Sequence, residues 1–192
     1  MKKTLFFLAF CSSFLLLATN VAAQESKNTT PINGKIARIV VNGRAKLTLK
    51  PTTDNSSPII TTDTAETDHT YNPATGEFTL NSGRATLTMA IPPSLTIETY
   101  SHARIKIPEG DTILADRITM ITQDFSRVVI DCPINSDTVT AFSFGHSSIT
   151  LDALEGYVIN LSDKEFSHIS IDRRTLFIKH YAKERNKFLG IF

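Results

Sequence analysis

The chain has 192 residues, of which 41% are hydrophobic and 20% charged, with 20 lysines and arginines against 19 aspartates and glutamates. This near balance of charge gives the chain no electrostatic reason to bind nucleic acid, whose phosphates require a basic face. The moderate hydrophobic content argues against disorder, and the 25 Thr and 20 Ile favour strands over helices.

Residues 1–23 have the features of a secretory signal peptide. Lys2 and Lys3 precede an apolar run of 14 residues from Leu5 to Ala18, shorter than the span of about 20 residues that a membrane helix needs. Small residues close the segment, so we expect cleavage after Ala23. The protein should therefore be exported by a Sec-type signal to the periplasm, the outer membrane or the cell exterior, with no transmembrane segment left after cleavage.

The mature chain keeps a single cysteine. Phe10 is too large for the position before a lipidated cysteine, so Cys11 does not indicate a lipoprotein. After cleavage Cys132 has no partner for an internal disulfide. We expect it to be a buried, unreactive thiol.

A short pattern repeats along residues 35–172, after a polar segment at 24–34 that we interpret as a flexible leader. Each repeat ends in two apolar residues separated by one residue, and the first apolar residue recurs at spacings of 23, 21 and 20: Ile105, Val128, Ile149 and Ile169. The positions eight and ten residues before these anchors are also apolar: Ile97, Met120, Ala141 and Leu161, and Leu95, Ile118, Val139 and Ile159. Residues 37–49 fit the same template, whereas 78–89 are one residue out of phase.

A repeat of about 20 residues is too small to bury its own apolar face, so successive repeats must stack. We therefore predict an all-β fold, a parallel β-solenoid or β-helix-like stack in which backbones pair at about 4.8 Å. An antiparallel β-sandwich is the alternative, because regular strand spacing produces alternation there too. The chain has only 8 glycines, and we expect the corners to be open turns formed by Ser, Asp and Asn.

Two segments depart from the repeat. Residues 50–77 are rich in Thr, Asp, Asn and Pro, which predicts a long loop or an irregular hairpin. Residues 173–192 are strongly basic and predict a last strand that caps the open end of the stack, followed by a basic tail.

The opening strand-turn-strand at 39–49, the segment Ala90-Ile91-Pro92-Pro93-Ser94-Leu95-Thr96-Ile97 and the short β repeats after it have counterparts in a known family. Together they resemble the putative auto-transporter adhesin head GIN domain, a domain of unknown function in exported proteins of Bacteroidetes. The resemblance covers roughly residues 35–172. It implies stacked β repeats and adhesion at the cell envelope, and it brings no catalytic residues.

Three aspartates form the most site-like feature of the sequence. Asp131, Asp152 and Asp172 each follow the last apolar residue of a repeat, so stacking would align them in one carboxylate edge. Such an edge could bind calcium or a basic partner, or abstract a proton from an acidic glycan. An aspartate there can also simply end a strand by bonding the turn backbone. We treat the three residues as a speculative binding edge.

The histidines give a weaker signal. His102 and His146 each lie three residues before an anchor, which places them on one side of the stack with one repeat between them. The scattered histidines and one mature cysteine do not have the spacing of a zinc site, so we interpret these two as surface residues at corners. We assign no catalytic, cofactor-binding or metal-binding residue.

These observations predict an exported, non-enzymatic β-repeat module that binds a protein or glycan partner at the cell envelope, without a cofactor. Two alternatives stay open. One is a polysaccharide lyase or hydrolase that acts on acidic glycans at the aspartate edge. The other is a structural envelope protein that self-associates through its end coils.

Overall fold

The computed structural model describes residues 27–64, 66–172 and 178–185. The predicted signal peptide, residues 1–23, lies outside this described part. The described residues contain strands and no helix: β1 (Asn28–Pro31), β2 (Arg38–Val41), β3 (Lys46–Thr52), β4 (Ile59–Thr62), β5 (His69–Asn72), β6 (Glu77–Leu80), β7 (Arg84–Ala90), β8 (Ser94–Thr99), β9 (Arg104–Ile107), β10 (Ile113–Thr122), β11 (Arg127–Ile130), β12 (Ile134–Ser143), β13 (Ser148–Leu151), β14 (Leu154–Asp163), β15 (His168–Ile171) and β16 (Ile178–Arg185).

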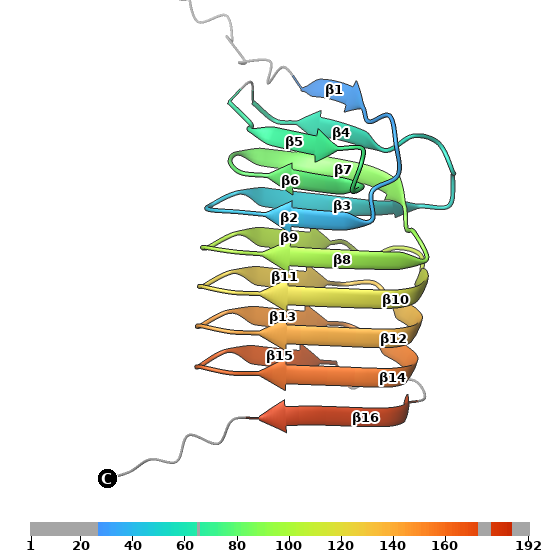
Figure 1. Cartoon of the computed structure of the whole chain (residues 1–192), viewed down its shortest axis with the longest axis vertical. Coiled ribbons are helices and arrows are strands. Elements are labelled where there is room, and N and C mark those ends of the chain that lie inside the picture. Colours follow the sequence, from blue (N-terminus) through green and yellow to red (C-terminus); the bar gives the residue numbers. More distant parts are fainter. Residues whose placement is uncertain (1–26, 65, 173–177, 186–192) are drawn as a thin grey trace, which may run out of the picture.

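The strands form two eight-stranded sheets that lie one behind the other (Figure 1). Sheet A, the rear sheet in this view, has the order β1-β4-β7-β3-β9-β11-β13-β15, and sheet B has the order β16-β14-β12-β10-β8-β2-β6-β5. From β6 onward the chain alternates between the two sheets, which makes most neighbouring strands parallel. One cluster of buried apolar side chains, contributed by both sheets, fills the space between them.

The register of the later strands follows the sequence repeat. Ile105, Val128, Ile149 and Ile169 are direct partners on the parallel strands β9, β11, β13 and β15. All four side chains are buried, while the residues that precede them face outward. The predicted equivalence of these four positions is confirmed.

The predicted architecture is matched only in part, because the chain is not a closed solenoid but a pair of mixed sheets. Strands β1, β4 and β5 pair antiparallel at one end of the molecule. The order of coils also differs from the order of the sequence, since β2 lies between β6 and β8 and β3 lies between β7 and β9. The all-β class is correct.

The phase shift at residues 78–89 has a simple cause. Val41 pairs with Leu80 and Leu47 pairs with Ala85. The segment that connects β6 to β7 therefore spans the same distance as the segment that connects β2 to β3, with one residue fewer. The structure also places β1 within the predicted leader at 24–34, and β4 and β5 within the predicted loop at 50–77.

An ion-pair cluster links strand β2 to both of its neighbours in sheet B, β6 and β8. Arg38 on β2 donates two hydrogen bonds to Glu98 on β8, from Nε to Oε1 at 3.0 Å and from Nη2 to Oε2 at 2.8 Å. Its Nη1 lies 3.0 Å from Oε2 of Glu77 on β6, and the Tyr100 hydroxyl donates to Glu98 Oε2 at 2.7 Å. Glu98 is buried, so these partners satisfy a carboxylate that burial would otherwise penalise.

Tight turns connect the sheets along one edge. Four of these turns have central residues with positive φ: Ser101 and His102, Asp124 and Phe125, Gly145 and His146, and Glu165 and Phe166. Three are closed by a hydrogen bond between their ends, as in Ser126 N–H to Gln123 O at 3.3 Å. The corners are therefore left-handed turns rather than the open turns expected. Among these eight residues, only Gly145 adopts the conformation without the steric cost that a Cβ brings.

Buried hydroxyl groups lie directly inside these turns. Ser147 Oγ donates to Thr122 O at 3.1 Å and accepts the Phe144 N–H at 3.1 Å. It also lies 2.8 Å from Ser143 Oγ and 3.0 Å from Thr122 Oγ1. This network satisfies polar groups that have no access to water, and it explains why a serine ends the turn.

We expect Ser147→Ala to lower the free energy of unfolding by about 1–2 kcal/mol, because buried partners of Ser147 lose a hydrogen bond. The measurement is urea-induced unfolding followed by circular dichroism. Ser148→Ala, one residue further on the outer side of β13, is the control and should change the midpoint little. Equal effects of the two substitutions would contradict a role for the buried network.

Candidate functional site

The connections at the edge opposite the tight turns shorten along the chain from β9 onward. Residues 108–112 join β9 to β10, residues 131–133 join β11 to β12, and residues 152–153 join β13 to β14. At the upper end, residues 53–58 and 91–93 lie at the same edge. Hollows lie between these connections.

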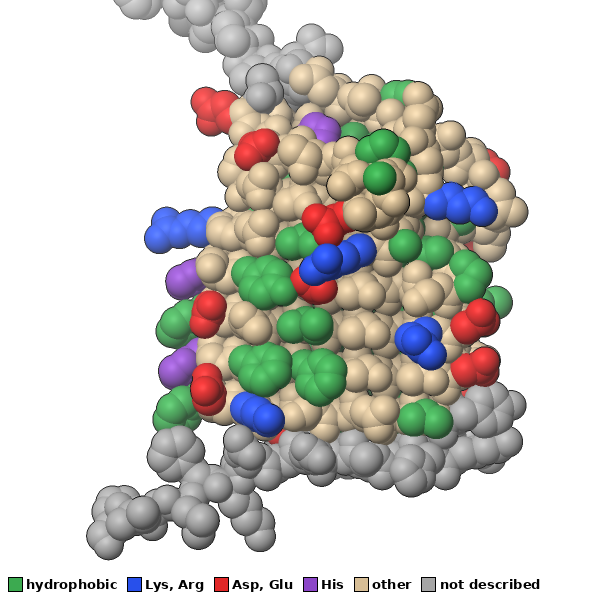
Figure 2. All heavy atoms as spheres, in the orientation of Figure 1, with side chains coloured by type: hydrophobic (Ala, Val, Ile, Leu, Met, Phe, Trp, Pro, Cys, Tyr) green, Lys and Arg blue, Asp and Glu red, His purple; other side chains and the backbone are tan. Residues whose placement is uncertain are grey.

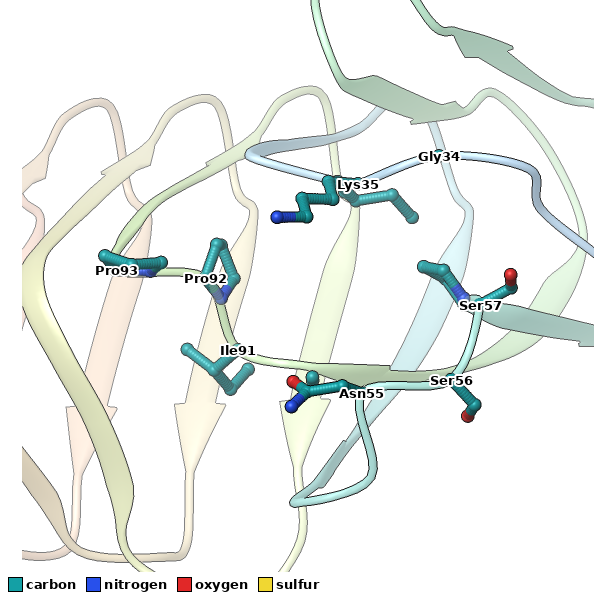
Figure 3. A pocket seen from close by; sticks show the side chains of 11 residues that line it. Gly34, Lys35, Asn55, Ser56, Ser57, Ile91, Pro92 and Pro93 are labelled. Atoms are coloured by element: carbon teal, nitrogen blue, oxygen red, sulfur yellow. The ribbon is translucent and has the colours of Figure 1, made fainter.

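The largest hollow has a volume of about 500 Å³ and lies between two of these connections (Figure 3). Asn55, Ser56 and Ser57 form one side, and Ile91 and the adjacent prolines form the other, with Lys35 between them. A second hollow of about 250 Å³ adjoins it, since both are lined by Asn55 and Ile91.

The hollows continue toward the lower coils. A third hollow of about 230 Å³ shares Asp111 with the second, and a fourth of about 380 Å³ shares Glu109 with the third. We refer to the four adjoining hollows as the edge groove. Its upper half is lined by prolines, Ile91 and hydroxyl groups, whereas Glu109, Asp111, Asp131 and Asp152 make its lower half acidic.

The structure places Asp131 and Asp152 together and leaves Asp172 outside the groove. Each of the three aspartates donates its backbone N–H to the coil above, at 2.9 Å from Ile107 O, Ile130 O and Leu151 O. They therefore extend one backbone ladder, and Asp131 and Asp152 both line the fourth hollow. Asp172 does not line it.

The carboxylates of this edge are not gathered for metal binding. Asp131 Oδ2 forms an ion pair with Lys106 Nζ at 2.9 Å, with both side chains partly exposed; such a surface pair contributes little to stability. Within residues 27–64, 66–172 and 178–185, no three His, Cys, Asp or Glu side chains are placed to hold a metal ion. The edge can offer hydrogen-bond acceptors to a ligand.

Cys132 borders the third hollow but does not offer a reactive thiol. The side chain is buried, as predicted. Burial raises the pKa of the Cys132 thiol to about 11, so the thiolate that acts as a nucleophile is absent near neutral pH.

A stack of histidine and phenylalanine rings, which we call the ring ladder, lies along the tight-turn edge. The sequence predicted only part of it. His102 and His146 lie on one side with one coil between them, as expected, and Phe125 from that coil lies between their rings. Ring centroids are 5.1 Å apart for His102 and Phe125, 4.9 Å for Phe125 and His146, and 5.0 Å for His146 and Phe166. Alternating histidine and hydrophobic side chains are visible along this edge in Figure 2.

The inner rings of this ring ladder, Phe125 and His146, present their edges to solvent rather than their faces. The rings are stacked with interplanar angles of 11°, 10° and 21°, so each inner face is covered by the next ring. Stacking of this kind stabilises the left-handed turns that position the rings. A recurring His or Phe at the same turn position was the sequence signal for Phe125 and Phe166.

No helix in the described part of the chain has the length and apolar character to cross a bilayer.

Comparison with known proteins identifies similar structures but no sequence family. No family model matches the chain, and no curated protein sequence matches it. The chain is similar to the crystal structure of a putative adhesin from Parabacteroides distasonis, with a TM-score of 0.65 and 11% identity over 77% of this chain and 64% of that one. It thus spans less than two thirds of that protein's length. At this identity the similarity shows a shared fold.

Two further structures overlap more loosely. One is a putative adhesin from Parabacteroides merdae, with a TM-score of 0.33 and 9% identity over 83% of this chain and 95% of that one. The other is a putative lipid binding protein from Parabacteroides distasonis, with a TM-score of 0.27 and 9% identity over 83% of this chain and 97% of that one.

Proposed function

We propose that the chain is an exported, non-enzymatic β-repeat module that binds a protein or glycan partner at the cell envelope. The observation that carries this proposal is the edge groove, a line of four adjoining hollows at one edge of the two sheets. The strands beside it are held in fixed parallel register, so its walls are preorganised for an extended ligand.

The fold supports an adhesive role of the head GIN type. One structure that shares this fold is that of a putative adhesin, and Ile91, Pro92 and Pro93, which belong to the resemblance seen in the sequence, line the largest hollow. The parallel register of β9, β11, β13 and β15 supports classing the repeats as a two-sheeted β-solenoid. Export rests on the predicted signal peptide at residues 1–23.

The groove offers two kinds of contact along its length. At the upper end of the groove, Ile91 and Pro92 offer apolar surface against which a partner can bury apolar groups. At the other end, the carboxylates of Glu109 and Asp152 can accept hydrogen bonds from hydroxyl or cationic groups of a partner. A partner that contacts both ends would have to be extended rather than compact.

The test is a substitution that fills the largest hollow. Beads that display the chain should adhere to outer-membrane, peptidoglycan or mucin surfaces, and Ser56→Trp should reduce that adhesion roughly tenfold by occupying the hollow. Thr70→Trp is the matched control, because Thr70 is exposed on β5 and does not line the groove. Equal adhesion of both variants would overturn the groove as the contact surface.

A second measurement addresses catalysis at the aspartate edge. The chain is incubated with a panel of acidic glycans, and newly formed reducing ends or unsaturated products are measured. We expect no turnover. Product formation that is lost in Asp152→Asn would overturn the non-enzymatic proposal and identify the chain as a lyase or hydrolase.

A further inference from the structure

The outer face of sheet A carries a row of basic side chains that is separate from the edge groove. Arg84 pairs with Lys46, Lys46 with Arg104, and Arg104 with Arg127, so the four are register partners on β7, β3, β9 and β11. All four side chains are exposed. Adjacent strands lie about 4.8 Å apart, which makes this basic row about 14 Å long.

Further positive charge flanks the row. Lys106 lies two residues beyond Arg104 on the same face, and Arg44 lies in the turn two residues before Lys46. Two carboxylates adjoin the row: Asp131 is paired with Lys106, and Asp63 directly follows β4 and donates its backbone N–H to Arg84 O at 3.2 Å. Within the described residues, the ion pairs involve Arg38 and Lys106 and no member of the basic row.

This arrangement opposes the stability of the sheet. Like charges directly opposite each other on adjacent strands are destabilising. The chain avoids this at the equivalent position on sheet B, where Arg38 has Glu77 as its register partner and forms an ion pair with it. Basic side chains are scattered singly over the sheet B face in Figure 2, whereas those of the basic row are aligned.

We propose that the basic row binds a linear acidic polysaccharide, whose carboxylate or sulfate groups lie across the strands of sheet A. An anionic chain would relieve the repulsion among Lys46, Arg104 and Arg127. Arginine contributes most of the row, and its guanidinium can bind a carboxylate or sulfate through two parallel hydrogen bonds. The inference names a ligand class for the binding role proposed above and rests on that role, but it uses a different face.

The geometry favours a polysaccharide over other polyanions. Proteins that bind single-stranded nucleic acid offer aromatic faces for base stacking, whereas both faces of Phe125 are covered by His102 and His146 within the ring ladder. Stable binding to an anionic membrane combines electrostatic attraction with apolar side chains that enter the lipid. The exposed Phe125 and Phe166 lie at the turn edge, each directly after an acidic residue, Asp124 or Glu165.

The threonines beside the row suit a hydroxyl-rich ligand. Thr86 and Thr48 are register partners and lie two residues beyond Arg84 and Lys46 on the same face. Their hydroxyl groups can donate to or accept from sugar hydroxyls. The spacing of adjacent strands is also close to the length of one sugar unit, so successive charged sugars could meet successive side chains.

The experiment measures binding of polygalacturonate to the full chain, with neutral dextran of similar length as the reference ligand. Polygalacturonate should bind and dextran should not, and binding should weaken as salt rises. The double variant Arg104→Gln with Arg127→Gln should bind polygalacturonate at least about tenfold more weakly. The matched control is Arg117→Gln with Lys164→Gln, which removes two exposed charges outside sheet A and should bind like the wild type.

Folding and the edge groove are controlled separately. The row variant should unfold at the same temperature as the wild type or higher, because it removes like-charge repulsion. Ser56→Trp in the groove should leave polygalacturonate binding unchanged, so failure of the groove proposal and failure of the basic row are distinguishable. Equal binding by the row variant and the wild type would overturn the inference. Tighter row-dependent binding of single-stranded DNA or of phosphatidylglycerol vesicles would also overturn it.

Discussion

Replacement of Ile149 with alanine is expected to lower the free energy of unfolding by about 2–5 kcal/mol. Ile149 is completely buried and lies between Val128 and Ile169 in the column of register partners. Backbone hydrogen bonds fix the spacing of β11, β13 and β15, so the coils cannot close over the cavity that the substitution creates. We therefore expect a value toward the upper end of the range.

The matched control is Val129→Ala, which removes an aliphatic side chain from the outward side of β11. Its side chain is half-buried, and its truncation should cost less than about 1 kcal/mol. Urea-induced unfolding followed by circular dichroism gives both values, with the shift in midpoint read at constant slope. A loss for Ile149→Ala no greater than that for Val129→Ala would contradict the shared interior column.

The interior column was predictable because it depends on a local regularity. Anchors such as Ile105 and Ile149 recur at a nearly constant interval, and only in-register stacking buries every one of them. Pairing of β9 with β11 and of β11 with β13 follows from that requirement alone. The same reasoning placed His102 and His146 on one side of the molecule.

The order of the coils was not predictable from the repeat. Strand β2 meets both β6 and β8, and nothing in residues 38–41 distinguishes this position from one at the end of the stack. The decisive groups are Arg38, Glu77 and Glu98, which come together only in the fold. Likewise, the left-handed conformation of Phe125 opposes the residue preference of such turns, and the ring ladder that favours it is a tertiary contact.

The candidate surfaces differ in how far the sequence revealed them. The alignment of Asp131 with Asp152 follows from the repeat, but the groove that they line also needs residues 53–58 and 91–93 to approach each other. The basic row has a sequence signal in the residue before each anchor, as in Arg104 and Arg127. The near-neutral total charge concealed it, because a sum over the chain carries no information about which side chains share a face.

Replacement of Glu98 with alanine is expected to lower the free energy of unfolding by about 2–3 kcal/mol. The substitution removes the acceptor of two hydrogen bonds from Arg38 and one from Tyr100. The loss stays below that of a fully buried pair, because the Arg38 side chain is 47% exposed and water can hydrate it. Glu77→Ala is the control: Arg38 keeps its two bonds to Glu98, so the expected loss is smaller.

The effect of Glu98→Ala should depend on pH in a defined direction. Burial alone would raise the pKa of the Glu98 carboxyl, but hydrogen bonds from Arg38 and Tyr100 outweigh it, and the folded-state pKa lies below the ordinary 4.5. The carboxylate therefore contributes fully above that ordinary value, and its contribution is lost as the pH falls through the lowered pKa.

The contribution of Tyr100 to stability has the opposite pH dependence and is lost in alkali. Burial, together with the bond to Glu98, raises the pKa of Tyr100 from 10.0 to about 12. The neutral phenol therefore contributes fully below pH 10, and its contribution is lost as the pH rises toward 12. Urea unfolding across this range should give the largest difference between wild type and Glu98→Ala in the neutral region, narrowing at both ends. A difference that is constant with pH would show that the cluster acts by packing rather than by charge.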